Sequence, residues 1–194
     1  MNRDEFNTYV SSHCATLDLA STNKKFLTMS PDEQRMWIKL INKEIMGKLS
    51  RIGIPADSMQ ADNTHIALSI RLLVKGKGLN QGPHNRINGE PHECYANCIS
   101  LIDEQHAIYY GYALNRGIKE DHHGNKSSFL IWIPHAWMVN KTTGKVSETT
   151  NEEWLAYFGV PVTVEELQYV ITTGVPKDAI GAVDIGQFEQ EHTN

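Results

Sequence analysis

Two segments rich in aromatic and β-branched residues constrain the fold of this chain more than any other feature. "HAIYYGYAL" (106–114) and "FLIWIPHAWMVN" (129–140) have the composition of strands, and Pro134 is expected to interrupt the second. "TTGK" (142–145) has the composition of a turn, so "VSETT" (146–150) is expected to return as a paired strand. The sequence therefore predicts antiparallel strands in the second half of the chain.

The N-terminal part has the periodicity of amphipathic helices instead. Apolar residues recur at helical spacing over residues 4–17, and Cys14 falls on that stripe, so it is interpreted as a core residue. A second helix is predicted to begin after Ser30. Ser30 and Glu33 have the spacing of a capping box, and Pro31 occupies the first helical position.

Three segments connect these helices to the predicted strands. Residues 66–74 alternate between apolar and other side chains, which predicts a strand, although "HIALSIRLLV" (65–74) is also compatible with a helix. Residues 75–91 are rich in Gly, Asn and Pro and predict a long loop. "CYANCISLIDE" (94–104) predicts a helix.

The remainder of the chain completes the fold class. Residues 115–128 predict a polar loop, "EEWLAYFGV" (152–160) is ambiguous, and Thr163 is expected to cap a last helix. This order of elements predicts an α+β protein. We expect an N-terminal helical region over residues 1–60 and an α+β domain over residues 61–194, with one continuous domain as the alternative.

Composition excludes some functions. The net charge is −5 and no basic stripe is present, which argues against nucleic-acid binding. No apolar run approaches the roughly 20 residues that span a bilayer, and the first residues lack the apolar region of a secretory signal. We therefore expect a cytoplasmic protein without membrane contact. Its three cysteines are then expected to be thiols.

"PHECYANC" (91–98) places a His, a Glu and two cysteines within eight residues. A disulfide between Cys94 and Cys98 is disfavoured, because both would lie on one helix face in a reducing compartment. A zinc site from His92, Cys94 and Cys98 with a distant His is also disfavoured, because no second ligand pair follows. We therefore expect no metal and no cofactor.

Two interpretations of the cysteines then remain open. In one, both are buried thiols on a helix. In the other, Cys94 is a nucleophile, because a helix N-terminus stabilises a thiolate through its N–H groups and its dipole. Cys98 lies one turn further along the helix and is expected to be a core residue in either case.

A nucleophilic thiol needs a base, and His135 is the candidate. It stands in "WIPHAWMVN" between Trp132 and Trp137, so it is expected to be rigid and partly desolvated, as a general base requires. A core histidine is the alternative. Glu148, on the returning strand, can accept the Nδ1–H bond of His135, and Asn140 competes for that role. Otherwise Glu148 is a solvent-facing strand charge and Asn140 a turn residue.

The three segments "ECYANCISLI", "YYGYAL" and "PHAWMVNKTTGKVSETT" together resemble the core of the transglutaminase-like branch of the papain-like superfamily, over about residues 90–162. The resemblance implies a Cys-bearing helix packed on an antiparallel sheet, a His-Ala-Trp strand and an acid on the next strand. Cys94, His135 and Glu148 match these positions in order. Glu148 stands where the family usually has Asp, and its spacing from His135 is short.

The expected activity is cysteine-dependent acyl transfer, as in an amidase, a peptidase or a transglutaminase-like enzyme. The Cys94 thiolate would attack an amide or ester, and His135 would protonate the leaving amine. The Cys94 N–H and the Asn88 side chain are candidate oxyanion donors. The expected partner is a protein, peptide or small amide substrate, and the oligomeric state stays open. The alternative is a non-catalytic binding or inhibitory protein of phage type on the same fold.

Overall fold

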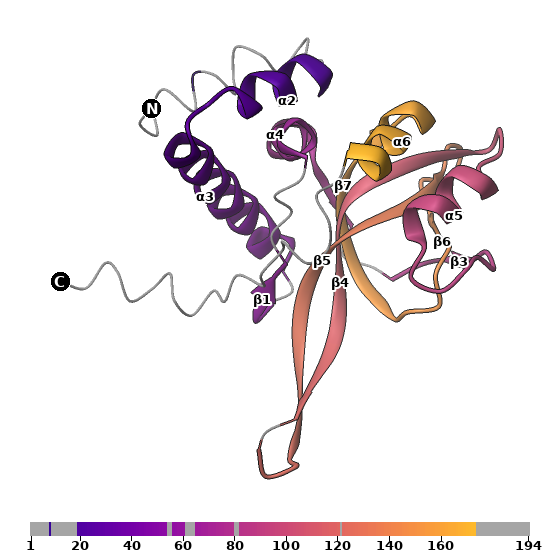
Figure 1. Cartoon of the computed structure of the whole chain (residues 1–194). Coiled ribbons are helices and arrows are strands. Elements are labelled where there is room, and N and C mark those ends of the chain that lie inside the picture. Colours follow the sequence, from indigo (N-terminus) through magenta and orange to yellow (C-terminus); the bar gives the residue numbers. More distant parts are fainter. Residues whose placement is uncertain are drawn as a thin grey trace.

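The computed structural model describes residue 8 together with residues 19–53, 56–60, 65–79, 82–120 and 122–173. Over these residues the chain is α+β, which confirms the predicted fold class (Figure 1). Apart from residue 8, the helix predicted over residues 4–17, with Cys14, lies outside the described residues.

The described part of the chain begins with helices and ends with a sheet and a final helix. The helices are α2 (Leu19–Leu27), α3 (Pro31–Leu49), the 3-10 turn η1 (Ser50–Ile52), α4 (Ile66–Lys75), α5 (Cys94–Leu101) and α6 (Val164–Thr173). The strands are β1 (Ser58–Met59), β2 (Lys77–Leu79), β3 (Asn85–Arg86), β4 (His106–Glu120), β5 (Lys126–Asn140), β6 (Val146–Glu148) and β7 (Trp154–Val162).

The strands form one seven-stranded mixed sheet. Its order is β2-β7-β4-β5-β6-β3, and β1 pairs separately with β5. β4 pairs antiparallel with β5 and with β7, whereas β1 and β3 pair parallel with β5 and β6. In the middle of the sheet, Gly111 of β4 lies opposite His135 on one side and Gly159 on the other.

Helix α3 begins where the sequence predicts. The Ser30 N–H donates to the Glu33 carboxylate at 2.9 Å, and the Glu33 N–H donates back to the Ser30 hydroxyl at 3.4 Å, which forms the capping box. Four apolar residues at helical spacing are buried: Trp37, Ile41, Ile45 and Leu49. They belong to the same hydrophobic cluster as α4 and the central strands.

The strand predicted over residues 66–74 is wrong, and the helical alternative is correct. Residues 66–70, 72 and 73 of α4 are all buried. Figure 1 shows α4 between α2, α3 and the sheet, and it contacts α2, α3 and β7. Because most sides of α4 are covered, its polar side is narrow and contains Arg71 and Lys75, and the apolar residues at every second position of so short a segment also fit a strand.

The polar loop predicted over residues 115–128 is also mostly wrong. β4 and β5 remain paired out to Glu120 and Lys126, and this ribbon extends beyond the body of the molecule (Figure 1). Most of its residues are exposed, so the polar composition reflects solvent on both faces of the ribbon. The loop predicted over residues 75–91 contains the short strands β2 and β3.

Pro134 does not interrupt β5. Trp132 accepts a backbone hydrogen bond from Gln60 on the side away from β4, and Pro134, two residues later, directs its nitrogen to that same side. Between the residues that pair with β1 and those that pair with β6, this edge of β5 has no strand against it within the described residues. A strand edge of this kind accommodates a proline.

The ends of the fold follow the predicted pattern. β6 returns from the "TTGK" turn as a strand paired with β5, and the ambiguous segment 152–160 forms most of β7. α6 has its own capping box, in which Glu166 and Thr163 exchange bonds of 3.0 and 3.1 Å. Arg71 of α4 donates two bonds to the Glu166 carboxylate, which joins these helices.

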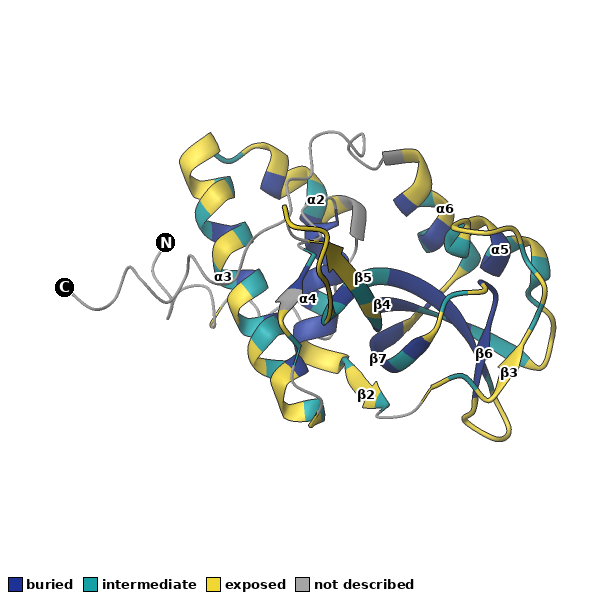
Figure 2. Ribbon diagram, turned by 90° about the horizontal axis from the view of Figure 1, so that it is seen from below, coloured by how far each residue is buried: buried dark blue, intermediate teal, exposed yellow. Residues whose placement is uncertain are grey.

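Two hydrophobic clusters fill the molecule, and Figure 2 shows the buried residues concentrated in the central strands and the inner faces of the helices. The larger cluster joins α3, α4 and one face of the sheet, including Ala136 and Met138 of β5. Trp137 and Val139, which alternate with them, belong to the smaller cluster and therefore lie on the opposite face. His135 has the same parity as Trp137.

Candidate active site

Cys94 is the first residue of α5, so its thiol lies at the N-terminus of that helix, as the sequence predicts. The side chain is partly exposed and is a free thiol. Cys94 and His135 both line one pocket of about 310 Å³. A helix N-terminus favours negative charge, so this position suits a thiolate.

Cys98 lies one turn deeper and is a core residue, as predicted. It is fully buried, and its Sγ lies 3.9 Å from the Thr149 hydroxyl oxygen. Burial, with the neighbouring Cys94, raises the pKa of Cys98 far above its usual range. Both cysteines of α5 are free, so the Cys94–Cys98 disulfide that the sequence disfavours is absent.

His135 faces Glu148 on its other side. The His135 Nε2 lies 3.1 Å from each carboxylate oxygen of Glu148, and both side chains are buried. The predicted bond to Nδ1 is therefore wrong: the carboxylate meets Nε2. The β5–β6 register pairs Met138 with Ser147, which sets Glu148 beside Trp137. The Glu148 side chain is one methylene longer than that of Asp, and it extends back along β5 to the Nε2 of His135.

The Glu148 carboxylate is held as an anion by further donors. Oε1 accepts the N–H groups of Thr149 and Thr150 at 2.8 and 3.0 Å and the Thr150 hydroxyl at 3.0 Å. Oε2 accepts the Tyr157 hydroxyl at 2.9 Å. Burial alone would raise the pKa of Glu148, but His135 and these donors hold it below the usual value. The charge is thus buried and fully paired.

Two tryptophans enclose the His135–Glu148 pair. The ring centroids of His135 and Trp154 are 4.2 Å apart, and Trp137 stacks at 6.2 Å with its plane within 16° of the imidazole. The Trp154 Nε1–H donates to the Thr150 hydroxyl at 3.1 Å, which fixes the indole in place. This aromatic cover keeps water from the pair and strengthens its electrostatic attraction.

The charge state of His135 follows from its two neighbours. Burial lowers its pKa, but the charge and hydrogen bond of Cys94, together with Glu148, outweigh burial and raise the pKa to about 10. An imidazolium is therefore stable beside Cys94 at neutral pH. Such a ring can stabilise a thiolate and later donate its proton.

The two asparagines considered for supporting roles lie elsewhere. Asn140 accepts the N–H groups of Thr142 and Thr143 at 3.1 and 2.9 Å, so it shapes the turn between β5 and β6 instead of orienting His135. Asn88 is exposed and is not among the residues that line the Cys94 pocket. Neither is brought to the site.

Asn97 is a structural residue of the site that the sequence patterns did not reveal. Its buried side chain donates to the backbone oxygens of Glu90 and Thr149 at 2.7 and 3.1 Å and accepts the Glu90 N–H at 2.9 Å. It therefore ties the loop before Cys94 to α5 and to the end of β6. In the sequence, the only sign of this role was that the Asn97 amide falls on the buried side of a predicted helix.

Comparison with known proteins gives no relatives. No protein-family model, no curated protein and no solved structure matches the chain. The arrangement of Cys94, His135 and Glu148 is therefore the basis for a functional interpretation.

The donors of Glu148 and the rim of the pocket were also missed. The Glu148 carboxylate accepts hydrogen bonds from Thr150 and Tyr157, and Trp154 donates in turn to Thr150. The one local signal in the sequence was "ETT", because a Thr just after an acidic residue can donate to its carboxylate. At the rim, the His92 Nδ1 lies 2.8 Å from a Glu152 oxygen, and His92 has a φ of 62°.

Metal ligands are not gathered in the part of the chain that the structure describes. No group of three or more His, Cys, Asp or Glu side chains there is placed to hold an ion. The proposed zinc ligands diverge, because His92 pairs with Glu152 whereas Cys98 is buried against Thr149. Among the described helices, none has both the length and the apolar composition needed to cross a membrane.

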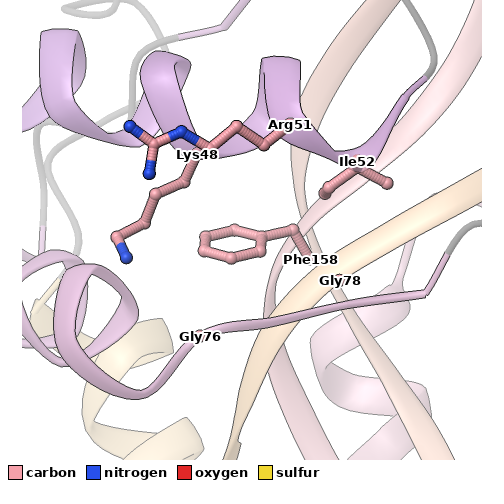
Figure 3. Close-up of a pocket in the computed structure, with 6 residues that line it drawn as sticks. All are labelled: Lys48, Arg51, Ile52, Gly76, Gly78 and Phe158. Carbon is pink, nitrogen blue, oxygen red and sulfur yellow. The ribbon is translucent and has the colours of Figure 1, made fainter.

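A second hollow, of about 430 Å³, lies between the end of α3 and strands β2 and β7 (Figure 3). Lys48 and Arg51 line it above Phe158. The two cations stand at the C-terminal end of α3, where the helix dipole favours positive charge. No nucleophilic or acidic side chain lines this hollow, so we do not consider it as the active site.

Proposed function

We propose that this protein is a cysteine-dependent acyl-transfer enzyme, of amidase, peptidase or transglutaminase-like type, with Cys94 as nucleophile, His135 as acid and base and Glu148 as the orienting anion. One observation carries the proposal. The thiol of Cys94, at a helix N-terminus, and the side chain of His135 line one pocket, and the Nε2 of His135 lies against a buried carboxylate. This is the connectivity of a nucleophile, a base and an orienting group.

The packing of α5 supports a core of the transglutaminase-like, papain-like kind. Its contacts with β5 bring the Cys-bearing helix against the strand that carries His135. β5 in turn pairs antiparallel with β4 along the His-Ala-Trp segment and with β6 directly after it. These relationships are those that the resemblance of residues 90–162 implies for the family.

The reaction proceeds through a thioester. The Cys94 thiolate attacks the carbonyl carbon of an amide or ester and forms a tetrahedral anion. When this collapses, the bond to the leaving group breaks, and His135 gives its proton to the departing nitrogen or oxygen. Water or an amine then attacks the thioester, His135 takes its proton, and Cys94 is released. Glu148 stabilises each imidazolium that forms.

The oxyanion is stabilised at the start of α5. The backbone N–H of Cys94 is at the positive end of the helix, where it can donate to the developing charge. The exposed position of Asn88 gives no support to its role as a second donor. The chemistry needs a reduced thiol, for which the cytoplasm that the sequence favours is suitable.

An ester with a coloured leaving group tests the proposal without knowledge of the natural substrate. With p-nitrophenyl acetate, we expect a burst of about one equivalent of nitrophenolate and acetylation of the Cys94 peptide in the mass spectrum. Cys94→Ala removes both signals, whereas Cys98→Ala, the matched control in the same helix, retains them.

The opposite result is equally informative. If Cys94 is not acetylated and reacts with iodoacetamide no faster in the folded protein than in the urea-unfolded chain, the thiol is not activated. The proposal then fails, and a binding protein on the same fold is the remaining interpretation.

A further inference from the structure

The pocket beside Cys94 has an uneven distribution of charge. Glu152 lines it, close to Cys94 and His135, and the buried Glu148 carboxylate lies behind His135. Neither a lysine nor an arginine is among its lining residues. When Cys94 and His135 form an ion pair, the two carboxylates leave the lining and the group behind it with a negative charge, and Arg86, which donates to the Asn151 backbone oxygen, is outside the lining.

Glu152 is the carboxylate that a ligand can reach. Its Oε1 lies 2.8 Å from the Nδ1 of His92, whose side chain is 83% exposed, whereas the Glu152 side chain is 24% exposed. Oε2 is buried and has no hydrogen-bond partner among the described residues. One carboxylate at the rim of the pocket therefore has one oxygen paired with a displaceable imidazole and one oxygen with unused acceptor capacity.

We infer that the group bound in this pocket is a cation, an ammonium or guanidinium carried by the acyl donor or by the amine acceptor, and that Glu152 is its counter-ion. A guanidinium or ammonium makes a charge-assisted bond to a carboxylate, so it can replace the exposed His92 side chain at Oε1. A forked guanidinium carries several N–H donors with which to compete for the accessible side of this carboxylate. Asn115, on the pocket wall, offers a further amide oxygen.

The same charges disfavour an anionic substrate. A carboxylate or phosphate in the pocket would meet Glu152 without a lysine or arginine to neutralise it. This inference rests on the proposed function only because the cation is described as part of a substrate of Cys94. The charge preference of the pocket can be measured separately from turnover.

Charged thiol reagents measure that preference at Cys94 itself. We would compare 2-aminoethyl methanethiosulfonate, which is cationic, with the anionic 2-sulfonatoethyl reagent and the neutral methyl reagent at low ionic strength. The rate of modification is followed on the Cys94 peptide by mass spectrometry. Relative to the same ratio for a small free thiol, which removes the intrinsic preference of any thiolate for a cation, we expect the cationic reagent to react about tenfold faster than the anionic one, because Glu152 lines the same pocket as Cys94.

Glu152→Gln is the decisive variant, since it keeps the size of the side chain and removes the charge. We expect it to reduce the cationic-to-anionic rate ratio by about threefold or more. Glu104→Gln, which removes an exposed acid that does not line the pocket, controls for net charge and should leave the ratio unchanged. A ratio near one in the wild type, or the same ratio in Glu152→Gln, overturns the inference.

The neutral reagent keeps this test distinct from that of the proposed function. A slow reaction with methyl methanethiosulfonate would count against an activated Cys94, yet the ratio of the charged reagents is still measured by longer exposure. Conversely, a fast neutral reaction with no charge preference leaves the acyl-transfer proposal intact and removes only the cationic substrate.

Discussion

The Nε2 atom of His135 lies 3.1 Å from both carboxylate oxygens of Glu148, and neither side chain is accessible to any appreciable extent. The contact joins the centre of β5 to the end of β6. It leaves the other ring nitrogen of His135 available to Cys94, which lines the same pocket. The imidazole thus has a buried anion at one nitrogen and shares a pocket with a partly exposed thiol.

Removing the charge of Glu148 should make the protonated form of His135 less stable. The pKa of His135, about 10 in the wild type, should fall in Glu148→Gln, because a stabilising carboxylate is lost from a buried site. Acylation that needs the imidazolium is lost as pH rises through that pKa, so this alkaline limb should move to lower pH. The acylation rate near neutral pH should fall about 10- to 100-fold.

The measurement is the pH titration of the His135 ring by NMR, together with the pH profile of acylation by an anilide, whose leaving nitrogen must be protonated. The same titration and the same alkaline limb in Glu148→Gln and the wild type would show that Glu148 does not act on His135.

The stability of the fold should depend on pH in two windows. The pKa of Glu148 is lowered from 4.5, so its contribution is present above about pH 4.5 and is lost as pH falls through the folded-state value. The pKa of His135 is raised from 6.5 to about 10, so its contribution is fully present below pH 6.5 and is lost as pH rises towards 10. Urea unfolding monitored by tryptophan fluorescence from pH 3 to 10 checks both limbs, and Glu148→Gln should flatten the acidic one.

Tyr157→Phe tests one donor to Glu148 in isolation. The variant keeps the buried ring and loses the 2.9 Å bond to Oε2, so the free energy of unfolding should fall by about 1–3 kcal/mol. Tyr109→Phe, in a partly buried tyrosine of β4, is the matched control and should change it by less. Chemical denaturation measures both variants. Equal stability of Tyr157→Phe and the wild type would mean that the bond contributes nothing.

Two Gly→Ala substitutions should act in opposite directions. A Cβ on Gly111 would lie 2.1 Å from the backbone oxygen of Phe158, where strands β4 and β7 pair, so Gly111→Ala should cost about 3 kcal/mol or more. A Cβ on Gly47, within α3, meets nothing within 4 Å, so Gly47→Ala should stabilise the protein by about 1 kcal/mol. Thermal unfolding of both variants compares them directly, and a tolerated Gly111→Ala would contradict the described strand pairing.

Local chemical signals made parts of this fold predictable. The capping box at Ser30 identified α3, and the "TTGK" turn identified the return to β6, because both depend on residues close in sequence. The same is true of Cys94 at the start of α5, which follows a loop. These elements are specified by short-range hydrogen bonds and turn geometry.

The errors arose where tertiary environment replaced the usual polarity pattern. α4 is covered on most sides and keeps only a narrow polar side, and the outer β4–β5 ribbon is solvated on both faces and so lacks an apolar one. The nitrogen of His135 that meets Glu148 depends on strand register and side-chain length, which no local pattern contains. The role of Asn97 depends on Thr149, more than 50 residues away.

The position of Pro134 has a consequence for how these molecules behave towards one another. The stretch of β5 that it occupies borders the Cys94 pocket, and an exposed strand edge there would be a template for pairing with a neighbouring chain. Pro134 has no backbone N–H, so it interrupts the row of backbone donors that pairing with another strand requires. The backbone at Pro134 is therefore a poor site for a second chain to pair beside the pocket.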